Sequence, residues 1–431
     1  MNHKIITKII SAQKHVYMVS PIPISAIPDL ARATPPSAEL HVLSPSDYEQ
    51  QVSVNQVTHD ANGVVNLQLP TTFHIQKVFN QMVVDAIAKN TSDIHITPFR
   101  STGKVVLRVD GQLVTLRELP KTLTVQLVVK IKMLANLDLA ETRLPQDGRL
   151  QVSISDKNID IRVSCIPTTL GERVVLRILQ RSNLPSIDQL GLESQDLQSL
   201  LSIVNKPAGL VLMIGPTGSG KTTSLYGCLK HLINSQRSIF TIEDPIEYHL
   251  EGISQTQVHQ KIGLTFATGL RAILRQDPDI ILIGEIRDSD TAKIAVSASL
   301  TGHLVLSTIH AQSVREAIHR LIDLGVPTSL ISGALLALVE QRLFRTLCQN
   351  HEPDNCKVCS ATGFYGRKAM FFIAKVTAAD QKLLWQYQNP NSTAMFSWEN
   401  SQESLVKKSG RYITQGVTTI AEIERVISLE A

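Results

Sequence analysis

Long apolar segments are missing from this chain of 431 residues. A helix that crosses a bilayer needs roughly 18 to 20 consecutive apolar residues, and no stretch of the sequence approaches that length. Near the N-terminus, Lys4, Lys8 and Lys14 interrupt the apolar residues that could otherwise resemble a signal or an anchor. We therefore expect a cytoplasmic protein that reaches a membrane only through a partner.

Aromatic residues and excess charge are also scarce. Phe, Trp and Tyr make up 4% of the chain, and 42 basic residues nearly offset 38 acidic ones. Proteins that coat nucleic acid typically have a strong basic excess, and single-strand binders add aromatic residues on which bases stack. We therefore expect no nucleic-acid partner. The remaining composition, 43% hydrophobic and 19% charged, is typical of a soluble globular protein.

The most informative run that is present is GPTGSGKTT, which follows the apolar segment LVLMI and precedes a helix-compatible stretch. Strand, glycine-rich loop and helix in this order form the context in which the GxxxxGK[ST] pattern cradles nucleoside triphosphates, whereas a mere linking turn would not need the full string. Lys221 would reach the terminal phosphates of ATP, and the hydroxyl of Thr222 would hold Mg²⁺. The expected nucleotide-binding residues of this loop are Gly215, Pro216, Thr217, Gly218, Ser219, Gly220, Lys221, Thr222 and Thr223.

The length of the chain predicts two or three domains, at roughly 150 residues each. Residues 1–74 contain the proline-rich pieces SPIPISAIP and ATPPSAEL, so we expect an N-terminal region that is partly linker and is a candidate docking segment. Residues 75–190 combine helical and hairpin patterns, which predicts a small α+β domain of the PAS-like kind. Residues 200–431 predict an α/β, RecA-like P-loop NTPase domain with a C-terminal zinc knuckle and a helical part.

The expected elements of these domains follow from apolar periodicity. In the small domain we expect helices from residue 75 and over residues 123–137, and hairpins over residues 105–116 and 150–165. In the second half, apolar runs at residues 210–214, 238–243, 280–285 and 303–308 alternate with helical segments. Such alternation predicts a parallel sheet covered on both faces. A long helix is expected over residues 329–347.

Polar residues follow several of the predicted strands. Glu285 comes directly after IILIG, which places a carboxylate at the carboxyl end of a buried parallel strand, where open α/β sheets bind ligands. There it can polarise an attacking water or hold Mg²⁺ through water. His303 and His310 flank another strand and would lie roughly 23 Å apart, too far to share a metal ion. Taken alone, Glu285 could equally be a surface glutamate, and His310 a loop histidine.

Together these strings resemble the secretion NTPase family, which includes the general secretory pathway protein E group and the type IV pilus assembly ATPases. In that family a Walker A box, an acid-rich Asp box, a Walker B box with GEIRD and a His box occur in one order. The same order is found here at residues 215–223, 241–247, 280–288 and 301–310. The similarity continues through GLTFATGLRAILRQDPD and, upstream, through SDIHITP, RLPQDGR, DIRVSCIPT and GERVVLRIL.

The resemblance implies a motor ATPase of the assembly branch. Glu285 takes the position of the catalytic glutamate, with Lys221, Glu243, His310 and Arg287 as further catalytic candidates. Arginines of both domains are implied to approach the phosphates of ATP, and the candidates are Arg149, Arg162, Arg271, Arg275 and Arg287. The resemblance also implies a homohexamer that turns a polytopic inner-membrane platform protein, with a second membrane protein docking on residues 1–74.

Three of the five cysteines are crowded between residues 348 and 359, and an odd count does not suggest a secreted disulfide framework. Cys348, His351, Cys356 and Cys359 form the pattern C-x2-H-x4-C-x2-C. Two pairs, each spaced by two residues, suit a tetrahedral Zn²⁺ site. The alternative is a lone Cys356–Cys359 pair with Cys348 buried on a helix.

Two other functions are compatible with a P-loop. A RecA-like DNA translocase shares the Walker boxes, but it should have basic and aromatic residues for strand binding, which are scarce here. A non-catalytic scaffold could switch an interaction by binding nucleotide without hydrolysing it, and Glu285 argues against that possibility.

Overall fold

The computed structural model describes residues 5–10, 13–19, 39–43, 71–154, 157–179, 184–352, 356, 358–359, 361–387, 396–398 and 401–427. The chain divides into two compact units, Met1–Asn80 and Gln81–Ala431, which are treated separately below. Most of the N-terminal region for which the sequence predicts linkers lies outside the described residues.

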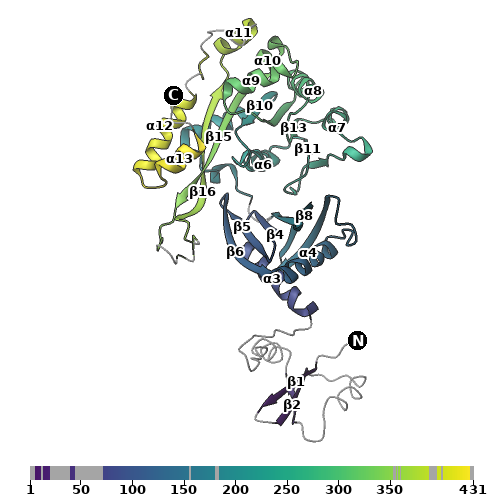
Figure 1. Ribbon diagram of the computed structural model, residues 1–431. Coiled ribbons are helices and arrows are strands. Elements are labelled where there is room, and N and C mark those ends of the chain that lie inside the picture. The colour runs from purple at the N-terminus through teal and green to yellow at the C-terminus, as the bar shows by residue number, and fades with distance from the viewer. Residues whose placement is uncertain are drawn as a thin grey trace. The chain divides into compact units, whose positions relative to one another are not determined.

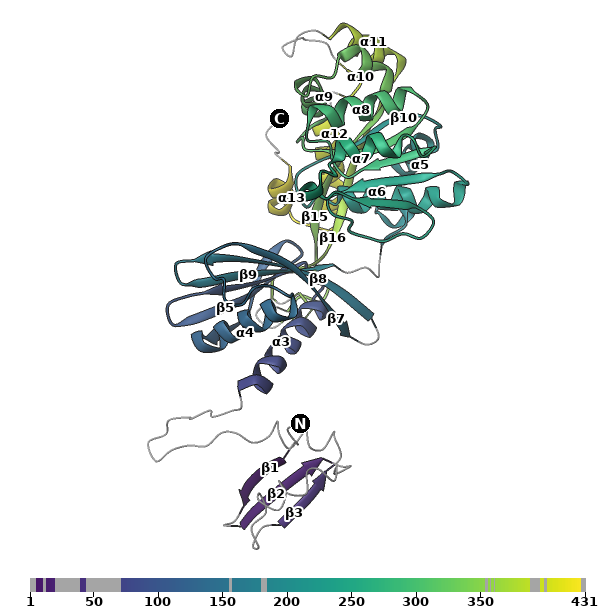
Figure 2. The same cartoon turned by 90° about the vertical axis from the view of Figure 1, so that its right-hand side faces the viewer.

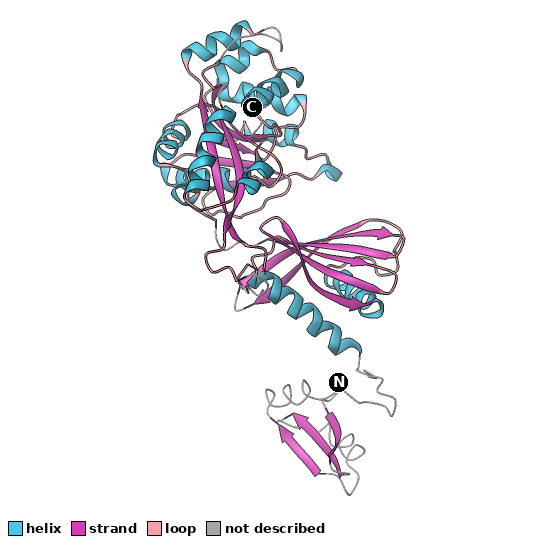
Figure 3. Ribbon diagram, turned by 60° about the vertical axis from the view of Figure 1, so that its left-hand side comes forward, coloured by secondary structure: helices cyan, strands magenta, loops and turns pink. Residues whose placement is uncertain are grey.

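The first unit contains a three-stranded sheet that the sequence patterns did not predict (Figure 3). Strand β1 (Ile5–Ile10) pairs antiparallel with β2 (Gln13–Val19), and β2 pairs parallel with β3 (Glu39–Leu43). Helix α3 (Thr71–Ala88) crosses the boundary between the two units, and it coincides with the amphipathic helix expected from residue 75.

The second unit begins with a six-stranded antiparallel sheet in the order β6-β5-β4-β9-β8-β7. Alternate residues of β4, such as Ile94 and Ile96, are fully buried on one face, which α4 covers (Figure 2). The predicted second helix and both hairpins are present. The element bounds are β4 (Asp93–Pro98), β5 (Thr102–Val109), β6 (Gln112–Pro120), α4 (Lys121–Leu134), β7 (Gln146–Ile154), β8 (Lys157–Thr168) and β9 (Gly171–Leu179).

A seven-stranded sheet in the order β12-β11-β13-β14-β10-β15-β16 forms the centre of the remaining chain (Figure 1). Neighbouring strands run parallel except β16, which is antiparallel to β15. The strands are β10 (Gly209–Ile214), β11 (Ile239–Glu243), β12 (Ser254–Gln257), β13 (Ile280–Ile283), β14 (Leu304–Ile309), β15 (Leu335–Leu347) and β16 (Phe364–Lys375). The predicted α/β fold is thereby confirmed.

Both faces of this sheet are covered, as the alternation of strands and helices predicted. Leu212 and Ile214 of β10 pack into one apolar cluster with α7, α8 and α9, whereas Val211 and Met213 pack into a second cluster with α5 and α6. The helices are α5 (Ser194–Val204), α6 (Lys221–Leu232), α7 (Phe266–Ile273), α8 (Ser289–Leu300), α9 (Val314–Asp323), α10 (Thr328–Ala334) and α11 (Ala378–Gln386), with single 3-10 turns at Ile187–Gln189, Ile233–Ser235 and Gln260–Ile262.

The long helix expected over residues 329–347 is wrong. Only α10 is helical there, and Leu335–Leu347 form β15, which lies between β10 and β16. Most residues of β15 are buried on both faces of the sheet. A strand buried on both sides lacks the alternation of apolar and polar residues that marks a half-buried strand, so periodicity does not distinguish it from a buried helix.

Two further helices, α12 (Ser401–Thr414) and α13 (Ile420–Val426), pack near the β15–β16 hairpin. Glu422 of α13 is completely buried and bonds both the backbone N–H (2.9 Å) and the Nε (3.0 Å) of Arg345 on β15. Arg425 donates two more hydrogen bonds to the same carboxylate. Desolvation favours the neutral acid, but the bonds from Arg425 and Arg345 outweigh it and lower the pKa of Glu422 to about 2.

Candidate functional site

The glycine-rich loop lies between β10 and α6, as the sequence predicted. Gly215, Gly218 and Gly220 have φ values of 146°, 80° and 88°, a region that other residues rarely adopt. A side chain at Gly218 would meet no atom within 4 Å, so conformation and not crowding requires glycine there. The loop ends at the N-terminus of α6, where backbone N–H groups and the helix dipole favour an anion.

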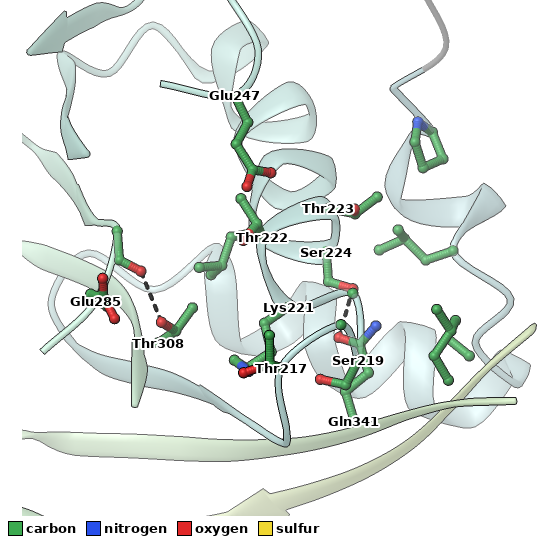
Figure 4. A pocket seen from close by; sticks show the side chains of 18 of the residues that line it. Thr217, Ser219, Lys221, Thr222, Thr223, Ser224, Glu247, Glu285, Thr308 and Gln341 are labelled. Carbon is green, nitrogen blue, oxygen red and sulfur yellow. Dashed lines mark hydrogen bonds between the residues drawn. The ribbon is translucent and has the colours of Figure 1, made fainter. Parts of the chain in front are cut away.

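Lys221 opens α6 and folds back over the loop. Its Nζ donates to the carbonyl oxygens of Gly215 (2.6 Å) and Pro216 (2.9 Å). Burial, together with the positive charge of Arg342, lowers the pKa of Lys221. Figure 4 shows that Lys221, Thr222 and the loop residue Thr217 lie together on the wall of one pocket.

This pocket has a volume of about 940 Å³. Its walls come from the loop and the start of α6, from the carboxyl ends of β11, β13 and β14, and from β15 and β16. The loops at the edge of the six-stranded sheet contribute Ser92, directly before β4, and Asp110, between β5 and β6, and Asp110 Oδ1 lies 3.1 Å from the Nε of Arg367 on β16. The predicted site residues that line the pocket are Thr217, Gly218, Ser219, Gly220, Lys221, Thr222, Thr223, Glu243, Glu285, Arg287 and His310.

Glu285 lies just beyond the end of β13, and 12% of its side chain is exposed. Its Oε2 is 2.6 Å from Arg287 Nε and 3.3 Å from His310 Nε2. The end of β13 is fixed to β14, because the Thr308 hydroxyl donates to the Gly284 carbonyl (2.8 Å). The structure therefore brings Glu285, Arg287 and His310 together, while His303 lies at the opposite end of β14 and bonds the Ala298 carbonyl.

Glu243 is nearly completely buried at the end of β11. Its carboxylate accepts hydrogen bonds from the hydroxyl of Tyr226 on α6, from the Thr241 hydroxyl (2.6 Å) and from Gln255 Nε2 (3.3 Å). Burial and the charge of Glu243 raise the pKa of Tyr226, which keeps the phenol protonated as a donor. Glu243 thus fixes α6 against β11, an arrangement that the sequence did not reveal.

The candidate arginines occupy three different surroundings. Arg149 and Arg162 face each other on β7 and β8, and Arg162 Nη2 donates to the Ile246 carbonyl of the acid-rich loop (3.4 Å). Arg162 Nε is buried and finds no acceptor among the described residues. Arg271 instead pairs with Asp290 at 3.2 Å, and Arg275 donates to the Arg271 carbonyl (2.8 Å). Of the five candidates, only Arg287 lines the described pocket.

Three buried cysteines form a cluster between β15 and β16. The Sγ atoms of Cys348, Cys356 and Cys359 all lie within 4.8 Å of one another, and Cys348 and Cys356 are 3.9 Å apart. Four sulfurs that bind one zinc ion at about 2.3 Å lie about 3.8 Å apart, so this cluster could hold the ion. His351 is exposed, but its Nδ1 is only 3.3 Å from Cys359 Sγ. A backbone hydrogen bond at Cys359 is the main cause that lowers the pKa of Cys356 to about 6.

Gln341 is a pocket residue that sequence reasoning missed. It lies on β15, directly beside the glycine-rich loop, and its side chain is 2% exposed. The misassigned helix over residues 329–347 placed this glutamine outside the sheet. The signal that could have revealed it is three consecutive polar residues, Glu340, Gln341 and Arg342, between apolar runs.

A glycine-rich phosphate loop between a buried strand and a helix, with a carboxylate at the end of a neighbouring strand, defines a P-loop nucleotide-binding domain. The chain belongs to the Type II/IV secretion system protein family, whose family model matches residues 70–425. The resemblance noted from the ordered boxes is therefore confirmed.

Similar proteins include the Type II secretion system protein E of Pectobacterium carotovorum, 42% identical over 381 residues that cover 83% of this chain and 76% of that protein. The Type II secretion system ATPase E of Vibrio cholerae is 35% identical over 467 residues, covering 96% of this chain and 92% of the relative.

The fold also resembles solved structures. The ATPase DotB of Legionella pneumophila matches with a TM-score of 0.64 and 21% identity, covering 86% of this chain and 99% of DotB. The pilus retraction motor PilT matches with a TM-score of 0.57 and 24% identity, covering 81% and 97%. Within the described residues, no helix combines the length and the apolar character that a membrane span requires.

Proposed function

We propose that this chain is a motor ATPase of a secretion system, which hydrolyses ATP to drive assembly of a type II secretion pseudopilus or a type IV pilus. The observation that carries the proposal is the position of Glu285, which lines the same pocket as Lys221 and Thr222. The names of the similar proteins from Pectobacterium and Vibrio, which cover most of this chain, support the secretion role.

In this proposal the glycine-rich loop and Lys221 hold the phosphates of ATP, and the Thr222 hydroxyl is the protein ligand of Mg²⁺. When bound, the ion supplies charge neutralisation at the phosphates. Glu285 orients and deprotonates the attacking water. His310 and Arg287 contact the carboxylate of Glu285 directly and hold it in place. Glu243 acts through Tyr226 and is a positioning residue for α6.

Arg149 and Arg162 are the arginines that we assign to the phosphates from the small sheet. Burial and the repulsion from Arg149 lower the pKa of Arg162, and its Nε finds no acceptor among the described residues. An unpaired buried donor is costly, and a phosphate oxygen would supply the acceptor. Arg271 lies on α7 and Arg275 in the turn that follows it, and both would need a second copy of the chain to reach a nucleotide.

The mechanical work of the proposed motor depends on which parts of the chain line the pocket. Because the six-stranded sheet and the central sheet both line it, the charge of a triphosphate changes the forces between them. We propose that a homohexamer uses this movement to turn a polytopic inner-membrane platform protein, and that residues 1–74 dock on a second membrane protein. The chain would then work in the cytoplasm, peripherally at the inner membrane.

We further propose that Cys348, Cys356, Cys359 and His351 bind a structural Zn²⁺. The three thiols and the imidazole have the composition of a Cys₃His site, and the separation of Cys348 and Cys356 fits tetrahedral ligation. The ion would fix the turn between β15 and β16 without taking part in hydrolysis.

The test compares two variants in a phosphate-release assay and an ATP-binding assay. Glu285→Gln should keep ATP binding and lose roughly 100-fold or more in kcat, the usual contribution of a general base. Lys221→Ala should lose binding as well, and it should not restore secretion or filament growth in cells that lack the native gene. Glu251→Gln, at an exposed position that does not line the pocket, is the control. A Glu285→Gln variant that hydrolyses ATP at the wild-type rate would refute the proposal.

A further inference from the structure

Gln341 occupies an unusual position for an amide. It lies in the interior of β15 between two buried charged residues, Glu340 and Arg342, whose side chains are 2.9 Å apart, and only 2% of it is exposed. Strand β15 pairs in parallel with β10, and the last pair of the register is Ile214 with Glu340. Gln341 therefore comes one residue past that pair, at the point where β10 turns into the glycine-rich loop.

The loop is shaped around Gln341. A Cβ atom added to Gly215 would lie 2.4 Å from the Gln341 carbonyl oxygen, and one added to Gly220 would lie 2.8 Å from Gln341 Nε2. The first and the last glycine of the loop thus approach the same residue from two sides. At Gly215 the close atom belongs to the backbone of residue 341, and only at Gly220 is it part of the Gln341 side chain, while the positive φ favours glycine at both positions.

The side chain of Gln341 also holds α6. The Ser224 hydroxyl donates to Gln341 Oε1 (2.9 Å), and Figure 4 shows this bond beneath the loop. Ser224 is completely buried in the first turn of α6, the turn that carries Lys221 and Thr222. Because Oε1 accepts this bond, the amide nitrogen is directed toward Gly220.

Burying an amide and a hydroxyl costs free energy that their mutual hydrogen bond only offsets. An apolar pair of the same size would fill the space equally well, so packing alone does not account for these two residues. A hydrogen bond differs from an apolar contact in that it fixes direction and distance. What the pair fixes is the position of the first turn of α6 relative to the loop.

We propose that Gln341 is a positioning residue for ATP, which sets the shape of the phosphate loop from beneath and aligns Lys221 and Thr222 with it through Ser224. This inference rests on the proposed function in one respect, namely that the loop binds ATP. It assigns no contact between Gln341 and the nucleotide. If the hydrogen bond between Ser224 and Gln341 is removed, the chain should bind ATP in the ground state and in the transition state more weakly by the same factor. KM should therefore rise while kcat changes little.

The test uses Gln341→Met, which keeps the length of the side chain without polar atoms, and Ser224→Ala, alone and combined. Each single variant should weaken the binding of a fluorescent ATP analogue about fivefold, as expected for one neutral hydrogen bond. The double variant should be no weaker than the singles, because both remove the same bond. Gln341→Glu keeps the acceptor for Ser224 but adds a negative charge beside the loop, so it should bind at least tenfold more weakly than wild type, and the difference should grow as salt is lowered, because less salt screens the repulsion less.

Ser332→Ala is the matched control, because Ser332 is also a buried serine and its hydroxyl donates one hydrogen bond, to the Gln381 carbonyl, away from the pocket. Thermal unfolding of every variant shows whether weaker ATP binding results from a less stable fold or from displaced Lys221 and Thr222 in a folded chain. Wild-type affinity in Gln341→Met, strictly additive losses in the double variant, or an equal loss in Ser332→Ala would overturn the proposal. Binding is measured without hydrolysis, so a wild-type chain that binds ATP but does not hydrolyse it would refute the motor function and leave this test intact.

Discussion

Replacing Glu422 with Gln removes one negative charge from between two guanidinium groups. The carboxylate is completely buried, and Arg345 and Arg425 bond both of its oxygens. Its pKa falls from 4.5 to about 2, and at 1.36 kcal/mol per unit this corresponds to about 3 kcal/mol of stability at neutral pH. Removing one partner of a buried ion pair typically costs about 3 to 5 kcal/mol, which agrees.

The expected loss for Glu422→Gln is therefore about 3 kcal/mol, or a fall in Tm of about 6 to 12 °C for a domain of roughly 200 residues. Thermal unfolding followed by circular dichroism measures it, and hydrogen exchange of α13 shows whether the loss is local. Glu424→Gln, on the exposed side of the same helix, is the control and should change Tm little.

The dependence on pH gives an independent check. Because the folded-state pKa is depressed, the stabilisation is fully present above about pH 4.5 and is lost as the pH falls toward about 2. Near pH 3 the difference between wild type and Glu422→Gln should shrink to about 1 kcal/mol. This reasoning would be refuted if Glu422→Gln were as stable as Glu424→Gln at neutral pH. It would also be refuted if the difference in stability between wild type and Glu422→Gln did not change with pH.

Tyr226→Phe should lower the free energy of unfolding in urea by about 1 to 3 kcal/mol, because buried Glu243 loses a hydrogen-bond donor; an unchanged midpoint would show that Glu243 does not need it. Metal analysis of the purified chain should find one zinc ion, and Cys359→Ser should lower that content, whereas Cys228→Ser, at a buried thiol of α6, should not. Freely reactive thiols at the cluster and no metal would contradict the zinc site.

The phosphate loop and the position of Glu285 could be predicted because their chemistry is local in the sequence. A glycine-rich loop or an acidic residue that directly follows an apolar strand is recognised by its residue type. Its place at the carboxyl end of that strand then gives its position in the fold. Glu285, Arg287 and His310 all follow the ends of predicted parallel strands. Such strands end at one edge of the sheet, so their proximity is expected from the sequence.

Gln341 and the Tyr226–Glu243 bond could not be predicted in this way. Their partners lie 117 and 17 residues away in sequence, and contact depends on which strands are neighbours. Residues 329–347 gave the further difficulty that a strand buried on both faces has no period of two. The phosphate roles of Arg271 and Arg275 remain predictions, since the described contact of Arg271 is with Asp290 and that of Arg275 is with the Arg271 carbonyl.

The order of strands in the central sheet has a consequence for biosynthesis. Strand β10 lies between β14 and β15, both of which leave the ribosome long after it. During synthesis the phosphate loop and the other ATPase motifs are therefore complete before Leu335–Leu347 are made. Only then can β15 pack beside β10 and fix the conformation of the loop. A chain arrested at residue 330 would contain every recognisable ATPase signature and still have no shaped cradle for a triphosphate.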